Sequence, residues 1–283
     1  MTDLPPLTRY AALAASARAQ VRPHRIAQPP VQAAELAHRL LHSPVDERRK
    51  ELEELDDRAL LDVLVVMELY TGSAYGLWRD TPSGFAEDVL GMTLTAEQRA
   101  VVDAVAGVDV RQVAARVPHP DNHVLAAVLV VWTALVPSPR PYSDCPRFAA
   151  LFAPYRQAAE SVWRHVARFV DNALLPGRLN MARHAWYVDG IEGPQRILAF
   201  AVWNTQPHAM GGLYQFVAVV ADADRIADPD MRATMNFLVN SVSAGSRFVA
   251  LGSDDDEPEE WFAAFETRDD VTRPVTSASR ERT

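Results

Sequence analysis

Residues 176–203, PGRLNMARHAWYVDGIEGPQRILAFAVW, contain the point at which the chain changes its periodicity. Pro176-Gly177 ends the preceding helical pattern, because proline cannot continue a helix and glycine favours a helix terminus. Two segments rich in β-branched and aromatic residues follow, at 183–189 and 196–203, with a turn-forming segment at 189–194 between them. The sequence therefore predicts strands after residue 176.

The segment 196–203 is apolar on both of its alternating faces, and so is the next apolar segment, 213–221. Strands of this kind belong to a sheet that is covered on both sides. A helix that starts at Asp228-Pro229, a strand at 247–251 and a last helix near Pro258 complete a β-β-β-α-β-α unit.

Upstream of residue 176 the apolar residues recur with helical spacing. We expect helices at 31–42, 44–54, 58–70, 97–106, 109–116, 122–136 and 154–175, with Ser43, Thr95 and Asp121 as N-caps. The predicted fold class is α+β: a mostly helical N-terminal half, followed by a β-β-β-α-β-α unit with a small, largely antiparallel sheet. The predicted regions are a flexible basic leader (1–30), a helical region (31–176), an α+β region (177–272) and a disordered tail (273–283).

Lys50 is the only lysine of the chain, and Cys145 is the only cysteine. A P-loop, a protein kinase and a pyridoxal enzyme each need a lysine at the reacting group. Lys50 lies in the charged run 46–54, which we expect to be solvated. One thiol cannot form a structural zinc site, an iron–sulfur cluster or an internal disulfide. We therefore expect no cofactor and no bound metal.

The net charge of −9 is distributed unevenly. The first 30 residues have a balance of +3, so the rest of the chain is strongly acidic and disfavours nucleic acid as a partner. The longest apolar runs fall short of the ~20 residues of a spanning helix, which predicts no membrane association. The lone cysteine and the lack of a secretory signal at Met1–Pro6 predict a cytoplasmic location.

The loop 204–212, which joins two predicted buried strands, is the best candidate site. Within it His208 could act as a general base at neutral pH, with Asp222 or Asp224 orienting the imidazole. The candidate catalytic residues are therefore His208, Asp222 and Asp224. The candidate ligand-binding residues are Asn204, Gly211, Gly212, His184 and Trp186, because the glycines could offer backbone amides to an anion and the other side chains lie on neighbouring segments.

Other clusters have simpler interpretations. Glu35, His38 and His42 share a helix face, but a carboxylate-bridged metal site needs a second such set. In the segment 119–123 Pro120 prevents one helix from aligning the two histidines, and Asp121 is explained as an N-cap. The acidic run 254–260 fits the start of a helix, where carboxylates complement the dipole.

The segment 94–116 has the rhythm of two helices of a helix-turn-helix. The helix that should read DNA, near residues 124–130, is instead apolar and suits a core.

Three hypotheses for function remain. The first is a cytoplasmic interaction or assembly protein without catalytic activity, whose partner is another protein or a second copy in an oligomer. The alternatives are a lysine-independent hydrolase or transferase that uses His208 as acid and base, and a transcriptional regulator that uses residues 94–116.

Overall fold

The computed structural model describes residues 31–71, 73, 75–107, 109–136, 148–173, 175–188, 196–203, 216–242, 246–255 and 257–274. A seven-stranded sheet in the order β1-β7-β6-β2-β5-β4-β3 forms its centre. The strands are β1 (Gln112–Arg116), β2 (Phe148–Phe152), β3 (Arg178–Asn180), β4 (Ala185–Val188), β5 (Arg196–Val202), β6 (Phe216–Ala221) and β7 (Arg247–Gly252).

The five strands from β1 to β5 along this order pair in parallel, and β4 and β3 extend the sheet by antiparallel pairing. Parallel strands need long crossover connections. Helix α7 (Asp121–Leu135) lies between β1 and β2 in the chain, and α9 (Pro229–Asn240) lies between β6 and β7. This is the βαβ arrangement of an α/β protein.

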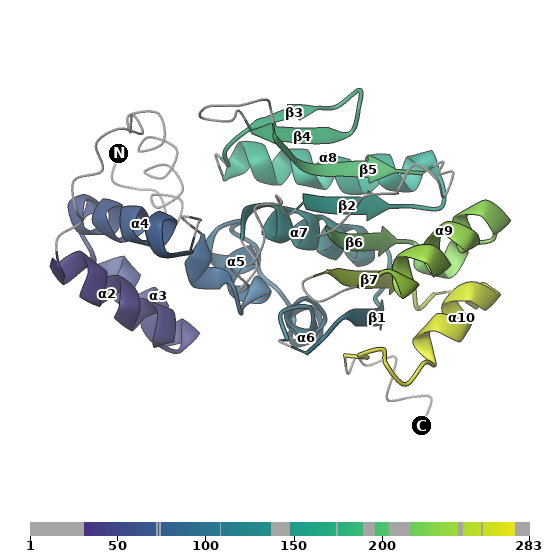
Figure 1. Cartoon of the computed structure of the whole chain (residues 1–283), viewed down its shortest axis with the longest axis horizontal. Helices are drawn as coiled ribbons and strands as arrows, with labels where there is room; N and C mark the ends of the chain where they lie inside the picture. Colours follow the sequence, from purple (N-terminus) through teal and green to yellow (C-terminus); the bar gives the residue numbers. More distant parts are fainter. Residues whose placement is uncertain are drawn as a thin grey trace.

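Helices cover both faces of the sheet (Figure 1). One face packs against α7, α8 (Arg156–Asn172) and the N-terminal helices, and the other packs against α9 and α10 (Glu260–Glu266). The N-terminal helices are α2 (Val31–His42), α3 (Val45–Glu54), α4 (Asp57–Thr71), α5 (Pro82–Asp88) and α6 (Ala96–Ala104), and short 3-10 helices lie at Gly76–Trp78 (η1) and Ala223–Arg225 (η3).

Helix α7 is the centre of the larger core. Thirteen of its fifteen residues are buried, because it is enclosed by the sheet, by α8 and by α5 and α6. A helix that is apolar on all sides has no stable place at a surface. The run 124–136 was expected to be a buried helix, and this prediction is confirmed.

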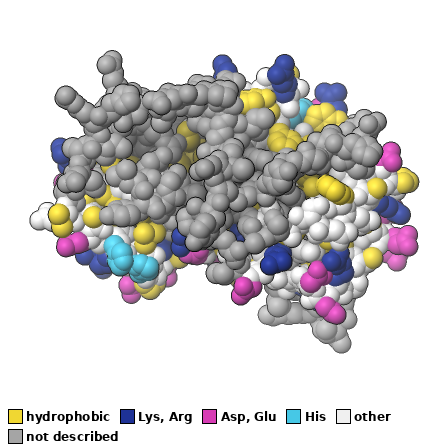
Figure 2. Space-filling view, viewed as in Figure 1, with side chains coloured by type: hydrophobic (Ala, Val, Ile, Leu, Met, Phe, Trp, Pro, Cys, Tyr) yellow, Lys and Arg dark blue, Asp and Glu magenta, His cyan; other side chains and the backbone are white. Residues whose placement is uncertain are grey.

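The surface of the described residues is mixed. Figure 2 shows acidic and basic side chains interspersed on the face that it presents. The exposed large hydrophobic side chains, Val31, Met181 and Phe237, lie on separate elements, which is normal for a folded protein. None of the helices among these residues combines the length and the apolar character that crossing a bilayer requires.

The predicted fold class, α+β with a small and largely antiparallel sheet, is wrong. The sheet has seven strands, and five of them pair in parallel. The fold is α/β. Strands from both sides of residue 176 take part in this one sheet, since β1 and β2 precede that residue.

Two strands cause the error. Residues 109–116 were expected to form a helix, but Gln112–Arg116 is strand β1, held by β7 on one side and by a bridge between Val113 and Thr272 on the other. Strand β2 is only five residues long and lies between β6 and β5. Segments this short carry too few residues to separate helical from alternating spacing, so tertiary pairing decides their structure.

The helix-start predictions have mixed outcomes. The capping box at Thr95 is confirmed. The Thr95 hydroxyl accepts from the Gln98 backbone N–H, and the Thr95 backbone N–H donates to Gln98 Oε1. Ser43 does not cap α3, because its hydroxyl donates to the Arg39 carbonyl. Asp121 lies inside the first turn of α7 and accepts a hydrogen bond from Gln98 at 2.8 Å.

Arg48 departs from the prediction of a solvated charged run. Its side chain is buried and donates to the carbonyl oxygens of Leu40, Ser43 and Leu77. Burial lowers the pKa of its guanidinium, although Asp80 and Asp88 oppose that effect. The buried guanidinium therefore ties α2 and α3 to η1.

Gly252, at the end of β7, allows close packing between the sheet and α10. A Cβ at this position would lie 2.7 Å from Cε1 of the Phe262 ring and 3.2 Å from Cβ of Asp224. We predict that Gly252→Ala lowers the free energy of unfolding by about 1–3 kcal/mol, because the ring must move in a packed core. Urea denaturation measures this change.

A shorter side chain provides the control. In a Phe262→Leu background the added methyl group has space. Gly252→Ala should therefore lower the free energy of unfolding less there than in the native chain. Equal costs in both backgrounds would show that this contact does not set the packing.

Candidate functional site

Strands β2 and β6 are neighbours whose chains leave the sheet in opposite directions. After β2 the chain passes through α8, on the larger-core face, and continues to β5, the neighbour of β2 on one side in the sheet. After β6 it passes through α9, on the opposite face, and continues to β7, which lies in the other direction along the sheet. In open α/β sheets, ligands bind outside the carboxyl ends of the strands at such a switch point. A ligand site is therefore expected at the carboxyl edge beside β2 and β6.

Asp222 follows β6 directly and is the centre of a buried polar cluster. The residue is 2% exposed and its backbone is left-handed, with φ of 50°. Asn122 Nδ2 donates to Oδ1 at 2.8 Å, and the Tyr155 hydroxyl donates to Oδ2 at 2.7 Å. His123 Nε2 lies 2.8 Å from the same Oδ1. Both oxygens of the carboxylate are therefore satisfied.

Three connections bring these residues together. Asn122 and His123 belong to the first turn of α7, which follows β1, and Tyr155 is the N-cap residue of α8, which follows β2. Asp222 follows β6. Because β1, β2 and β6 run parallel, all three connections begin at the same edge of the sheet.

The cluster fixes the ionisation of its members. Burial alone would raise the pKa of Asp222, but hydrogen bonds from His123, Tyr155 and Asn122 lower it to about 2. Burial and the hydrogen bond to Asp222 raise the pKa of Tyr155 to about 12. At neutral pH the site therefore holds a carboxylate and a neutral phenol.

The other ring nitrogen of His123 reaches a second hydroxyl. His123 Nδ1 lies 3.0 Å from the Oγ of Ser161, on the second turn of α8. His123 is buried, whereas Ser161 is partly exposed. The hydrogen-bonded series Ser161–His123–Asp222 therefore connects the surface to the buried carboxylate.

The start of α8 offers donors and positive charge. No side chain among the described residues caps this helix at Tyr155. The Arg225 guanidinium lies beside the Tyr155 hydroxyl, and this contact raises the pKa of the arginine. Arg156, in the first turn, is largely exposed and pairs with Glu160.

Asp224 lies two residues beyond Asp222. Its Oδ1 accepts from the Ser253 backbone N–H at 2.8 Å, and Arg225 Nε lies 3.6 Å from Oδ2. Burial raises the pKa of Asp224. Asp224 thus connects η3 to the end of β7.

The other predicted ligand-binding residues with a described position are His184 and Trp186. The His184 ring contacts the rings of Trp203, with centroids 4.8 Å apart, and Trp163, at 6.3 Å, and burial lowers the pKa of its imidazole. Trp186 is buried and donates to the Pro176 carbonyl. Four further predicted residues, Asn204, His208, Gly211 and Gly212, lie outside the described residues.

Asp222 and His123 were each identified from the sequence, but their pairing was not predicted. Tyr155 and Ser161 were not identified. The signal was present in part, because Asp222 follows an apolar strand and His123 opens an apolar helix. Their pairing became visible only once 112–116 was known to be a strand parallel to β6 and β2.

The described residues contain no group of three histidine, cysteine, aspartate or glutamate side chains able to hold a metal ion. On α2 the rings of His38 and His42 lie 4.6 Å apart and contact each other.

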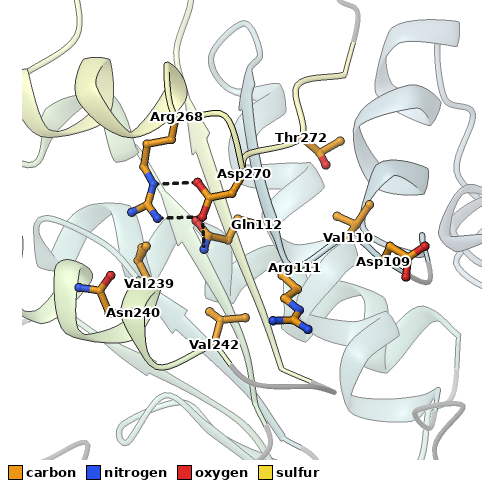
Figure 3. Close-up of a pocket in the computed structure, with 10 residues that line it drawn as sticks. All are labelled: Asp109, Val110, Arg111, Gln112, Val239, Asn240, Val242, Arg268, Asp270 and Thr272. Carbon is orange, nitrogen blue, oxygen red and sulfur yellow. Dashed lines mark hydrogen bonds and ion pairs between the residues drawn. The ribbon is translucent and has the colours of Figure 1, made fainter.

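A cavity of about 480 Å³ lies away from this edge, at the amino end of β1 and the carboxyl end of α9. Figure 3 shows Arg268 and Asp270 paired within it. Gln112 Nε2 also donates to Asp270 at 3.3 Å. Arg268 and Asp270 are thus occupied with each other, and the polar cluster at the switch point is the site that we consider further.

No protein-family model matches the chain, and no curated protein matches it. Two solved structures of the ATPase domain of the large terminase of Thermus phage P74-26 are similar to it. A mutant form has 15% identity and a TM-score of 0.46, covering 71% of this chain and 90% of that chain. Another structure of this domain has 14% identity and a TM-score of 0.46, covering 71% and 89%. The likeness concerns the fold alone.

These findings correct the predicted function and partners. The comparisons do not support the interaction or assembly hypothesis, with another protein as partner and nucleic acid disfavoured: the matched structures are described as ATPase domains of a large terminase. The His208 hydrolase or transferase is not tested, because His208 lies outside the described residues. The helix-turn-helix alternative is also wrong, because its expected second helix is strand β1.

The low pKa of Asp222 has a consequence for stability. A carboxylate whose pKa falls from its ordinary value near 4 to about 2 on folding stabilises the fold above pH ~4 and loses this contribution as the pH falls toward 2. We predict that Asp222→Asn lowers the free energy of unfolding at pH 7 by about 2–3 kcal/mol, because its amide offers donors to groups that themselves donate.

Urea denaturation at several pH values measures the difference, which should narrow between pH 4 and pH 2. Asp230→Asn, on the exposed first turn of α9, is the matched control and should change stability little. A pH-independent difference for Asp222→Asn would contradict the ionised cluster.

Proposed function

We propose that this protein binds a phosphate-bearing small molecule, such as a nucleotide, at the carboxyl edge of the sheet beside β2 and β6. The observation that carries the proposal is the start of α8 at the switch point, which no described side chain caps and which has Arg225 beside Tyr155. Backbone N–H groups at a helix start, together with the helix dipole, favour a phosphate.

The charge at this position supports an anionic ligand. Arg225 and Arg156 supply guanidinium groups, which match phosphate oxygens in geometry. Asp222 does not oppose an anion strongly, because three donors already satisfy its carboxylate. Asp224 and Asp255 both bond to Ser253 at the end of β7, and Asp224 Oδ2 also lies 3.6 Å from Arg225 Nε.

Aromatic rings at the same edge support a planar group on the ligand. Tyr155 and Trp203 follow β2 and β5 and are both partly exposed. Rings of this kind stack on nucleobases at a gain of about 1–3 kcal/mol per base. A nucleotide combines the phosphate and the planar group that this edge fits.

Binding of this kind differs from that of a P-loop. The connection between β1 and α7, Val117-Pro118-His119-Pro120, contains neither glycine nor lysine, and its prolines lack an N–H. The proposal therefore assigns the phosphate to the start of α8. We also propose a cytoplasmic location, for which the lone cysteine is the support.

The proposal predicts binding of ATP with a Kd below about 1 mM, equivalent to a binding free energy of about −4 kcal/mol. Isothermal titration calorimetry on the full chain, with ATP, ADP and inorganic phosphate as separate ligands, measures it. Arg225→Met should weaken ATP binding about 10-fold, because a charge-assisted hydrogen bond to phosphate is lost.

Arg58→Met is the matched control, since Arg58 is exposed on α4, in the N-terminal helical part. It should bind ATP as the native chain does. Failure of all three ligands to bind, or equal weakening by both substitutions, would refute the proposal.

A further inference from the structure

We propose that Ser161 is a nucleophile, that His123 is its general base, and that Asp222 orients the imidazole. The observation is the continuous hydrogen-bonded series in which Ser161 Oγ lies 3.0 Å from His123 Nδ1 and His123 Nε2 lies 2.8 Å from Asp222 Oδ1. Nucleophile, base and orienting carboxylate in this order define a serine triad by geometry, whatever the fold.

The proton positions follow from the surroundings. Asp222 is a carboxylate at neutral pH and can only accept hydrogen bonds, so the proton of a neutral imidazole lies on Nε2. His123 Nδ1 then carries a lone pair and accepts the hydrogen of the Ser161 hydroxyl. This is the arrangement that a general base needs before it removes a proton.

Packing holds the imidazole in this position. His123 is 4% exposed, and its own backbone N–H is bonded to the Asn122 side chain at 2.8 Å. Asn122 also donates to Asp222. The partly exposed hydroxyl of Ser161 is the end of the series that a substrate can reach.

The substrate class is an activated ester. Ser161 Oγ attacks the carbonyl carbon while its proton moves to His123 Nδ1. The bond from that carbon to the leaving oxygen then breaks, and the leaving alkoxide takes the proton from His123. Water next attacks the acyl-serine, gives a proton to Nδ1, and releases the acid as the proton returns to Ser161. Ester and water are the only reactants.

This inference is independent of the proposed nucleotide binding, which depends on Arg225 and the start of α8. A chain that binds no nucleotide could still contain a reactive Ser161.

A fluorophosphonate probe, which a serine attacks at phosphorus with loss of fluoride, tests the proposal on the full chain. Intact-mass and peptide measurements should find one adduct, on Ser161. Ser161→Ala should abolish labelling without loss of fold, checked by circular dichroism. Ser241→Ala, which removes a hydroxyl bonded to the Phe237 carbonyl on α9, should label as the native chain does.

The roles of the two other residues have their own readout. His123→Gln should slow labelling at least ~100-fold, as expected for loss of a general base, and Asp222→Asn should also slow it. If His123→Gln or Asp222→Asn unfolds, Ser161→Cys provides a second test. Its thiol should react with iodoacetamide faster in the folded chain than a free cysteine does in the urea-unfolded chain. No adduct on Ser161, or unchanged labelling in Ser161→Ala, would overturn the proposal.

Discussion

The buried carboxylate of Asp222 is the interaction on which the arrangement of the carboxyl edge depends. It accepts hydrogen bonds from Asn122 and Tyr155 and pairs with His123, so it joins the connections that follow β1, β2 and β6. A buried charge is costly unless it is paired and hydrogen-bonded. Here the partners come from three separate segments, so the charge is stable only when all three strands are in register.

The same cluster has polar groups on two of its sides. Toward α8 there are a helix start without a described cap, Arg225 and the partly exposed Ser161. Toward β7 there are Ser253 and the acidic segment that precedes α10. Asp224 reaches both sides, since it accepts from Ser253 and lies 3.6 Å from Arg225. The proposed phosphate binding and the proposed nucleophilic attack both concern the α8 side. The ordered carboxylate contributes to both by holding Tyr155 and the His123 ring in place.

Sequence patterns predicted the long elements well, because helices such as α7 and α9 carry enough residues for periodicity and end signals to agree. The fold class failed on two five-residue strands, β1 and β2, whose structure depends on partners 50 or more residues away. The prediction of the site was incomplete for the same reason, because its residues come from segments far apart in the sequence. Asp222 was singled out by its place after an apolar strand, whereas Tyr155 and Ser161 had no local signal at all.

The central position of β2 has a consequence for how the chain is made. This strand leaves the ribosome before β5 and β6, the two strands that enclose it, and most of the sheet cannot close until residue 221 has been synthesised. A nascent or truncated chain therefore exposes a short apolar ribbon with unpaired amides, which is a template for misassembly. The two halves of this protein are thus poor candidates for separate expression, because each would lack hydrogen-bonding partners that the other supplies.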